Sequence, residues 1–200
     1  MFRIISFGAV FILAACASTG IDKSYLDGLD KSNSAQLRLA SGDKSPGTFM
    51  NAGPTVAVRK YTDETCVNEK TVAKLRNGPF GGAKQNSLNM ALNDFHKNAA
   101  TETYIEANKP VTFLFHQETN DGTTVVSCGS IVQTTFEAGK DYELSIDFVP
   151  STDDIICKVD LNEIVTTASG STRNFIKSFD NSAEGVSQQC LNAFQKTRWF

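Results

Sequence analysis

Residue types that mark catalysis or metal binding are scarce in this sequence. Its 200 residues include two histidines, His96 and His116, and one tryptophan. The chain lacks the Cys-x-x-Cys and His-x-x-x-His spacings of zinc sites. It also lacks the Gly-x-Ser-x-Gly motif of serine hydrolases and the Gly-x-x-x-x-Gly-Lys-Ser/Thr loop that holds phosphates. We therefore expect no catalytic residues, no metal and no cofactor, and we predict that the protein is not an enzyme.

Positively charged residues are also fewer than negatively charged ones. Lys and Arg number 19 against 22 Asp and Glu, which gives a formal net charge of −3. A nucleic-acid-binding domain typically carries a basic patch, and no basic cluster stands out here, so we expect no nucleic-acid partner. After residue 16, no apolar run approaches the roughly 20 residues that a membrane-spanning helix needs.

The N-terminus has the pattern of a secretory signal. Arg3 supplies a short basic start, an apolar run extends from Ile4, and small residues precede Cys16. This order of a basic start, an apolar stretch and small residues is typical of a signal peptide, and the run is too short for a spanning helix.

The end of this segment, Leu13-Ala14-Ala15-Cys16, resembles the lipobox of bacterial lipoproteins. In that family the cysteine sulfur receives a diacylglycerol, the peptide is cut before the cysteine, and the new amine is acylated. The resemblance implies a signal peptide of residues 1–15 and a lipid anchor at Cys16 that holds the protein to a membrane. Each buried CH₂ contributes about 0.8 kcal/mol, so three acyl chains anchor almost irreversibly.

The residue after the cysteine bears on location. In the proteobacterial version of the family, Asp at this position favours retention in the inner membrane. Ala17 therefore indicates the outer membrane of the bacterial envelope, with the folded part facing the periplasm. The alternative is an ordinary signal peptide that is cut near Ala15 or Ala17, in which Cys16 has no role.

Four cysteines remain beyond Cys16, an even number that indicates two disulfides in an exported protein. We favour one bridge between two strand-like segments and a second that ties an early segment to a terminal helix. Each bridge contributes roughly 3–5 kcal/mol through loop closure. The favoured pairs are Cys128–Cys157 and Cys66–Cys190, and the leading alternative is Cys66–Cys128 with Cys157–Cys190.

Composition divides the mature chain into two parts. Residues 16–33 are small, polar and charged, which is typical of a tether. Residues 34–200 are long enough to form one domain with a substantial core. The alternation of apolar and polar residues is clearest over 142–148, where Tyr142, Leu144 and Ile146 alternate with polar residues.

Seven or eight short strands separated by turn signals predict a mainly β fold, an antiparallel β-sandwich of immunoglobulin-like or transthyretin-like type. Helical spacing of apolar residues over 86–99 predicts one inserted helix. Ser182 is suited to N-cap a C-terminal helix. The pattern also suggests a long strand over 123–136, with a bulge at Gly129, and a loop with an edge strand over 165–179.

Two predicted corners, at residues 105–111 and 136–142, share the pattern apolar-x-Ala-Gly/Asn-Lys. This pattern is loosely similar to hairpin corners of small proteobacterial envelope lipoproteins to which no chemistry is assigned. The resemblance therefore implies a location and a kind of fold, but no activity.

Two functions remain open at this point. The first is a non-enzymatic interaction or envelope-support module, held to the membrane by Cys16 and contacting an envelope protein. The second is a small-ligand carrier or enzyme with a pocket between the sandwich and the helix over 86–99. In that case His116, together with Tyr104 or Glu118, would supply the polar groups that orient a ligand.

Overall fold

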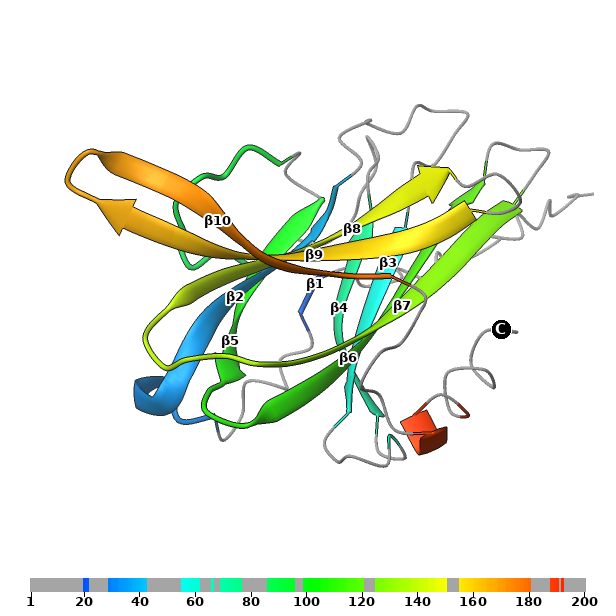
Figure 1. Ribbon diagram of the computed structural model, residues 1–200, viewed down its shortest axis with the longest axis horizontal. Helices are drawn as coiled ribbons and strands as arrows, with labels where there is room; N and C mark the ends of the chain where they lie inside the picture. Colours follow the sequence, from blue (N-terminus) through cyan, green and yellow to red (C-terminus); the bar gives the residue numbers. More distant parts are fainter. Residues whose placement is uncertain are drawn as a thin grey trace, which may run out of the picture.

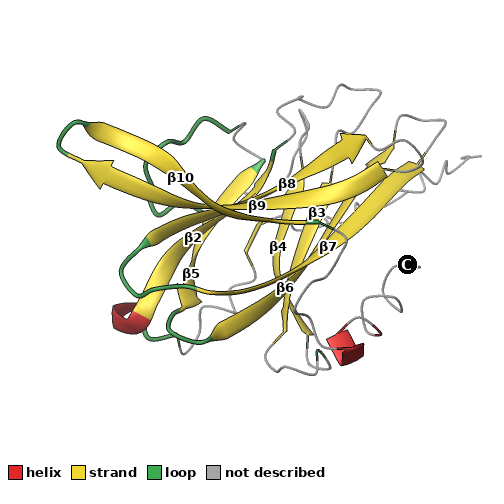
Figure 2. Cartoon of the chain, viewed as in Figure 1, coloured by secondary structure: helices red, strands yellow, loops and turns green. Residues whose placement is uncertain are grey.

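A computed structural model shows a β-sandwich of two five-stranded sheets (Figures 1 and 2). The strand order is β1-β4-β3-β6-β7 in the first sheet, called sheet A here, and β10-β9-β8-β2-β5 in the second, sheet B. The residues that the structure describes are 20–21, 29–42, 55–61, 66, 69–76, 86–95, 99–120, 125–150, 155–180, 188–190 and 192.

The strands follow the expected segments closely, and the mainly β sandwich is confirmed. A 3₁₀ turn at Lys31–Asn33 leads into sheet B. The strands are β1 (Gly20–Ile21), β2 (Ser34–Ser41), β3 (Thr55–Tyr61), β4 (Glu69–Arg76), β5 (Ala100–Glu106), β6 (Pro110–Asn120), β7 (Val125–Thr135), β8 (Asp141–Pro150), β9 (Ile155–Thr167) and β10 (Gly170–Phe179).

The core lies between the sheets and is built from alternate residues of each strand. In β6, Phe113 and Phe115 are fully buried and point inward, since successive side chains of a strand face opposite ways. Phe113 makes edge-to-face contacts with Phe115 and Phe136, at centroid distances of 6.3 Å in each case. Burying apolar surface at about 25 cal/mol per Å² makes this core the main source of stability.

One strand pairing departs from the expected antiparallel sandwich. Strand β2 lies between β5 and β8, antiparallel to β5 but parallel to β8. The parallel register runs from Gln36 opposite Asp141 to Ser41 opposite Ile146. Sheet B is therefore mixed. A parallel pair needs a long connection, and most of sheet A lies between β2 and β8 in the sequence.

The two corners with the shared sequence pattern also share a conformation. Asn108 and Gly139, at equivalent places in the pattern, have φ values of 62° and 76°. Both residue types tolerate this left-handed region better than others do. The backbone N–H of Asn108 donates to the carbonyl of Phe136 at 2.7 Å, so the two corners are joined.

The predicted inserted helix over 86–99 is wrong for the residues that the structure describes there. Residues 86–95 form an irregular segment across the outer face of sheet B, which we call the strap. Asn89 and Leu92 have φ values of 61° and 57°, which no right-handed helix contains. The backbone groups of the strap bond mainly to side chains of sheet B, as described below, although the Asp94 amide bonds to the Leu92 carbonyl within the strap.

Other expectations have mixed outcomes. The expected bulge at Gly129 is absent, because the β6–β7 register is continuous and places Gly129 opposite His116. A glycine permits a bulge but does not require one. Residues 170–179 form the edge strand β10, with a bulge between Phe175 and Lys177. Of the C-terminal helix, residues 188–190 and 192 are helical, and its expected start at Ser182 lies outside the described residues.

The segment expected to be a tether carries structure at both described places. Gly20 and Ile21 form β1 and pair with Lys74 and Ala73 of β4. Near the other end, the Asp30 carboxylate accepts from the Ser32 amide at 2.9 Å and caps the 3₁₀ turn. The sandwich therefore receives contributions from residues well before position 34.

Candidate functional sites

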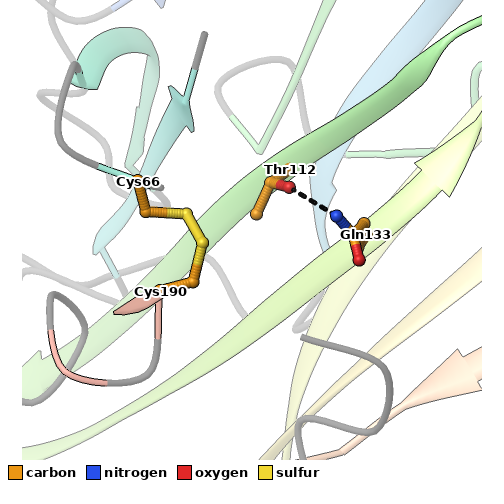
Figure 3. The surroundings of a disulfide bond; sticks show 4 residues. All are labelled: Cys66, Thr112, Gln133 and Cys190. Carbon is orange, nitrogen blue, oxygen red and sulfur yellow. Dashed lines mark hydrogen bonds between the residues drawn. A yellow bond between two sulfur atoms is a disulfide. The ribbon is translucent and has the colours of Figure 1, made fainter. Parts of the chain in front are cut away.

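The outer face of sheet A is covered through a disulfide. Cys66 and Cys190 are joined across a sequence separation of 124, with their Cα atoms 4.9 Å apart. Figure 3 shows the bridge lying over the β6 ribbon, near Thr112 and Gln133. Around it, Tyr61, Cys66, Leu114, Ile131 and Cys190 form a buried apolar cluster separate from the main core.

A second disulfide joins the two sheets. Cys128 of β7 and Cys157 of β9 are bonded, with Cα atoms 5.4 Å apart, and both belong to the main core. The favoured pairing of the four cysteines is thereby confirmed. Opposite Cys128 lies Gln117, whose fully buried side-chain amide has no hydrogen-bond partner.

The outer face of sheet B is held by a buried arginine. Arg38 of β2 has no exposed side-chain surface, although it projects from the face opposite the core. Its Nη1 donates to Glu143 Oε2 at 3.0 Å, and its Nη2 to Glu102 Oε1 at 2.8 Å. The same guanidinium donates to the carbonyls of Met90, Ala91 and Leu92, at 3.0, 2.9 and 3.1 Å.

Glu102 completes the attachment of the strap from the next strand. Its Oε2 accepts from the Leu88 amide at 2.5 Å and from the Met90 amide at 3.3 Å. The Ser87 hydroxyl donates to the same oxygen at 3.1 Å. Arg38 thus binds the carbonyls of the strap and Glu102 binds its amides, which replaces the hydrogen bonds that a helix would make.

The charged row continues to the edge of the sheet. Glu143 of β8 accepts from Arg173 of β10, from Nε to Oε1 at 2.8 Å. Arg173 also bonds to Asp94 and to the Leu92 carbonyl, at 2.5 and 2.9 Å. Burial lowers the pKa of Arg173, but the hydrogen bonds that it donates to Glu143 and Asp94 outweigh this effect, so its pKa is raised. Arg173, Glu143, Arg38 and Glu102 therefore form a row of alternating charge across sheet B.

Three members of this charged row, Glu102, Arg38 and Glu143, are buried, whereas the side chain of Arg173 is 27% exposed. Arg38 is fully buried, and each of its N–H groups has an acceptor within the protein. Burial raises the pKa of the neighbouring Asp141, with a further contribution from the charge of Glu102. A buried ion pair is costly to desolvate and needs complete hydrogen bonding, which this one has. The arrangement fastens the strap to sheet B.

The residues proposed to line a ligand pocket come together only in part. His116 lies on the outer face of sheet A, whereas Tyr104 lies on the outer face of sheet B, beside Gln36. Glu118 shares the face of His116. Burial lowers the pKa of His116, and the charge of Arg59 lowers it further while that of Glu118 raises it. The strap lies over the sheet that does not contain His116, so the pocket has no basis in this geometry.

Large exposed apolar side chains, among the described residues, gather mainly on the edge strand β10. Phe175 is 63% exposed and Ile176 is 48% exposed, at the bulge of that strand. The Arg173 guanidinium lies over the Phe95 ring at 5.4 Å, beside this pair. Figure 1 shows the β9–β10 hairpin projecting beyond the rest of the sandwich. We call Phe175, Ile176 and the adjoining edge of β10 the edge patch.

Sequence reasoning missed the charged row completely. Alternation along β2 and β8 indicates that Arg38 and Glu143 face outward, and an outward charge is normally solvated. Nothing in the local sequence shows that another segment covers them. One signal was present, since two long charged residues at outward positions of paired strands are placed to form cross-strand ion pairs.

No protein-family model, curated protein or solved structure matches this chain. Within the part of the chain that the structure describes, no helix is long and apolar enough to cross a membrane. The same residues contain no group of three or more potential metal ligands.

Proposed function

We propose that this chain is a lipoprotein of the bacterial outer membrane, anchored at Cys16 and facing the periplasm, that acts as a non-enzymatic interaction or envelope-support module. The lipobox-like segment ending at Cys16 and the two disulfides support an exported, anchored protein. Residues 1–15 are a signal peptide in this proposal, and Ala17 directs the protein to the outer membrane.

The observation that carries the interaction role is the edge patch. Each sheet has its outer face partly covered, one by the disulfide-linked cluster and the other by the strap. The described residues leave the largest apolar exposure at Phe175 and Ile176 on an unpaired sheet edge. An unpaired edge with apolar side chains is suited to bind an extended segment of a partner protein.

The anchor is tested by replacing the cysteine. Cys16→Ser removes the acceptor of the acyl chains, so we expect the protein to move from the membrane fraction to the soluble periplasmic extract. Membrane association that survives the substitution contradicts the anchor. Ala17→Asp should move the anchored protein toward the inner membrane, and an unchanged outer-membrane fraction contradicts the sorting argument.

The partner contact is tested by photocrosslinking in cells. A photoreactive residue at Ile176 should capture one reproducible envelope protein, identified by mass spectrometry. Val125 is a matched control, because it is 58% exposed and apolar but lies on β7. Capture of the same protein from both positions, or from neither, argues against the edge patch as the contact surface.

A further inference from the structure

The link between Cys16 and the folded domain is short. Gly20 pairs with Lys74 of β4 and begins the described structure. Cys16 precedes Gly20 by four positions, and a stretch of that length spans at most about 14 Å when fully extended. A lipid at Cys16 therefore holds β1, and β4 beside it, close to the membrane surface.

Strand β4 carries positive charge at this place. Lys74 and Arg76 are both exposed, and a register shift in the β3–β4 pairing places the exposed Lys70 on the opposite face of the sheet. Lys74 and Arg76 project from the outer face of sheet A, because Ala73 and Leu75 beside them belong to the core. Neighbouring strands lie about 4.8 Å apart, so the Lys74 backbone is adjacent to Gly20. The chain as a whole has a net charge of −3, which makes this basic strip a local feature.

We infer that the basic strip of β4, defined by Lys74 and Arg76, docks on anionic phospholipid headgroups of the membrane that holds the anchor. The inference rests on the proposed function, because only a lipid at Cys16 brings β4 to the membrane. Attraction to an anionic surface falls off within a Debye length, about 8 Å at physiological salt. A short anchor keeps the cations within that range, where a long tether would not.

Docking through β4 also fixes which side of the sandwich faces away from the membrane. Strand β1 lies beside β4 and β5, and β5 is at one end of sheet B. Strand β10, with the edge patch, is at the other end of sheet B. The anchor and the basic strip thus turn one side of the sandwich to the lipid and leave the edge patch accessible to a partner.

Lysine labelling on vesicles tests this orientation. The lipidated full-length protein is reconstituted into phosphatidylcholine vesicles with and without phosphatidylglycerol, acetylated by a water-soluble reagent, and analysed by mass spectrometry. Lys74 should react about fivefold more slowly on the anionic vesicles, the factor expected for one cation held at an anionic surface. Lys177, exposed on β10, is the internal reference and should react equally on both. High salt should remove the difference, because it screens the attraction.

A variant pair separates specific docking from general charge. Arg76→Glu should reduce the protection of Lys74, whereas Lys158→Glu, on β9, should leave it unchanged. Equal labelling of Lys74 on neutral and anionic vesicles overturns the docking inference while the protein stays vesicle-bound and the anchor stands. A protein that does not remain with the vesicles at all overturns the anchor, and the docking inference with it.

Discussion

The two outer faces of the sandwich are covered in physically different ways. On sheet A, a disulfide and an apolar cluster around Leu114 hold the cover in place. On sheet B, the strap is attached by the buried ion pairs and hydrogen bonds of Arg38 and Glu102. A covalent link tolerates imperfect surroundings, whereas a buried charge is tolerated only if every partner is present. The cover of sheet B should therefore be more sensitive to single substitutions.

Removing the disulfide that covers sheet A should have the largest effect on the free energy of unfolding. Cys66→Ala with Cys190→Ala opens a loop with a sequence separation of 124. The loop-closure model gives a loss of about 5 kcal/mol in the free energy of unfolding. The matched pair Cys128→Ala and Cys157→Ala, with a separation of 29, should cost about 3.5 kcal/mol by the same model. Denaturant unfolding of both double variants measures the difference, and the opposite order would reject loop closure as the main cause.

Breaking the cover of sheet B needs only one substitution. Arg38→Met leaves Glu102 without its buried counter-charge, leaves Glu143 with Arg173 alone, and leaves the Met90 and Ala91 carbonyls without their donor. Removing one member of a buried ion pair costs about 3–5 kcal/mol. The control is Arg173→Met, whose side chain is 27% exposed and should cost less. Hydrogen exchange should show faster opening at the amides of Leu88 and Met90 in the Arg38 variant, and equal losses in the two variants would contradict the assignment.

The strap shows where sequence reasoning stops. Periodicity correctly indicated the strands, and cysteine parity with strand position indicated the disulfides, because both are local patterns or simple counts. The same periodicity predicted a helix over 86–99, because Leu88, Leu92 and Phe95 recur at helical spacing. The conformation of the strap depends on Arg38, more than 50 residues earlier in the chain, whose guanidinium donates to the carbonyls that a helix would use.

The edge patch was only partly foreseen. An edge strand was expected within 165–179, and β10 is one. The exposure of Phe175 was not expected, because alternation alone assigns an aromatic residue to the core. The bulge between Phe175 and Lys177 shifts the register there, and a local sequence gives no sign of it.

One substitution in the interior between the two sheets should stabilise the protein. Gln117 is fully buried, and neither atom of its amide has a hydrogen-bond partner. An unsatisfied buried polar group costs about 1–3 kcal/mol. Gln117→Met keeps a similar shape without the polar group, so thermal unfolding should move to higher temperature. A lower unfolding temperature would show that the amide contributes to folding in a way that these contacts do not explain.

The smallest expected effect concerns the pH dependence of stability that His116 causes. The fold lowers the pKa of His116 below its ordinary value of 6.5, mainly through burial. The unfolded state therefore binds the proton more readily, and stability should fall as the pH drops below 6.5 toward the pKa of the folded state. Unfolding of the wild type and of His116→Gln, compared between about pH 5 and 8, measures this, because histidine changes charge in that range. A variant with the same pH dependence as the wild type would exclude His116 as the cause.

The parallel pairing of β2 with β8 has a consequence for how the chain folds. Arg38 of β2 meets Glu102 at a sequence separation of 64 and Glu143 at a separation of 105. Neither neighbour of β2 exists for a chain that has emerged only as far as its first hundred residues. Contacts of such high sequence separation slow folding, and chains that wait for them expose unpaired strands. During synthesis, β2 must therefore remain unpaired until at least β5 has emerged, and it lacks its parallel partner until β8 has, so in that interval its unpaired edges are exposed to aggregation.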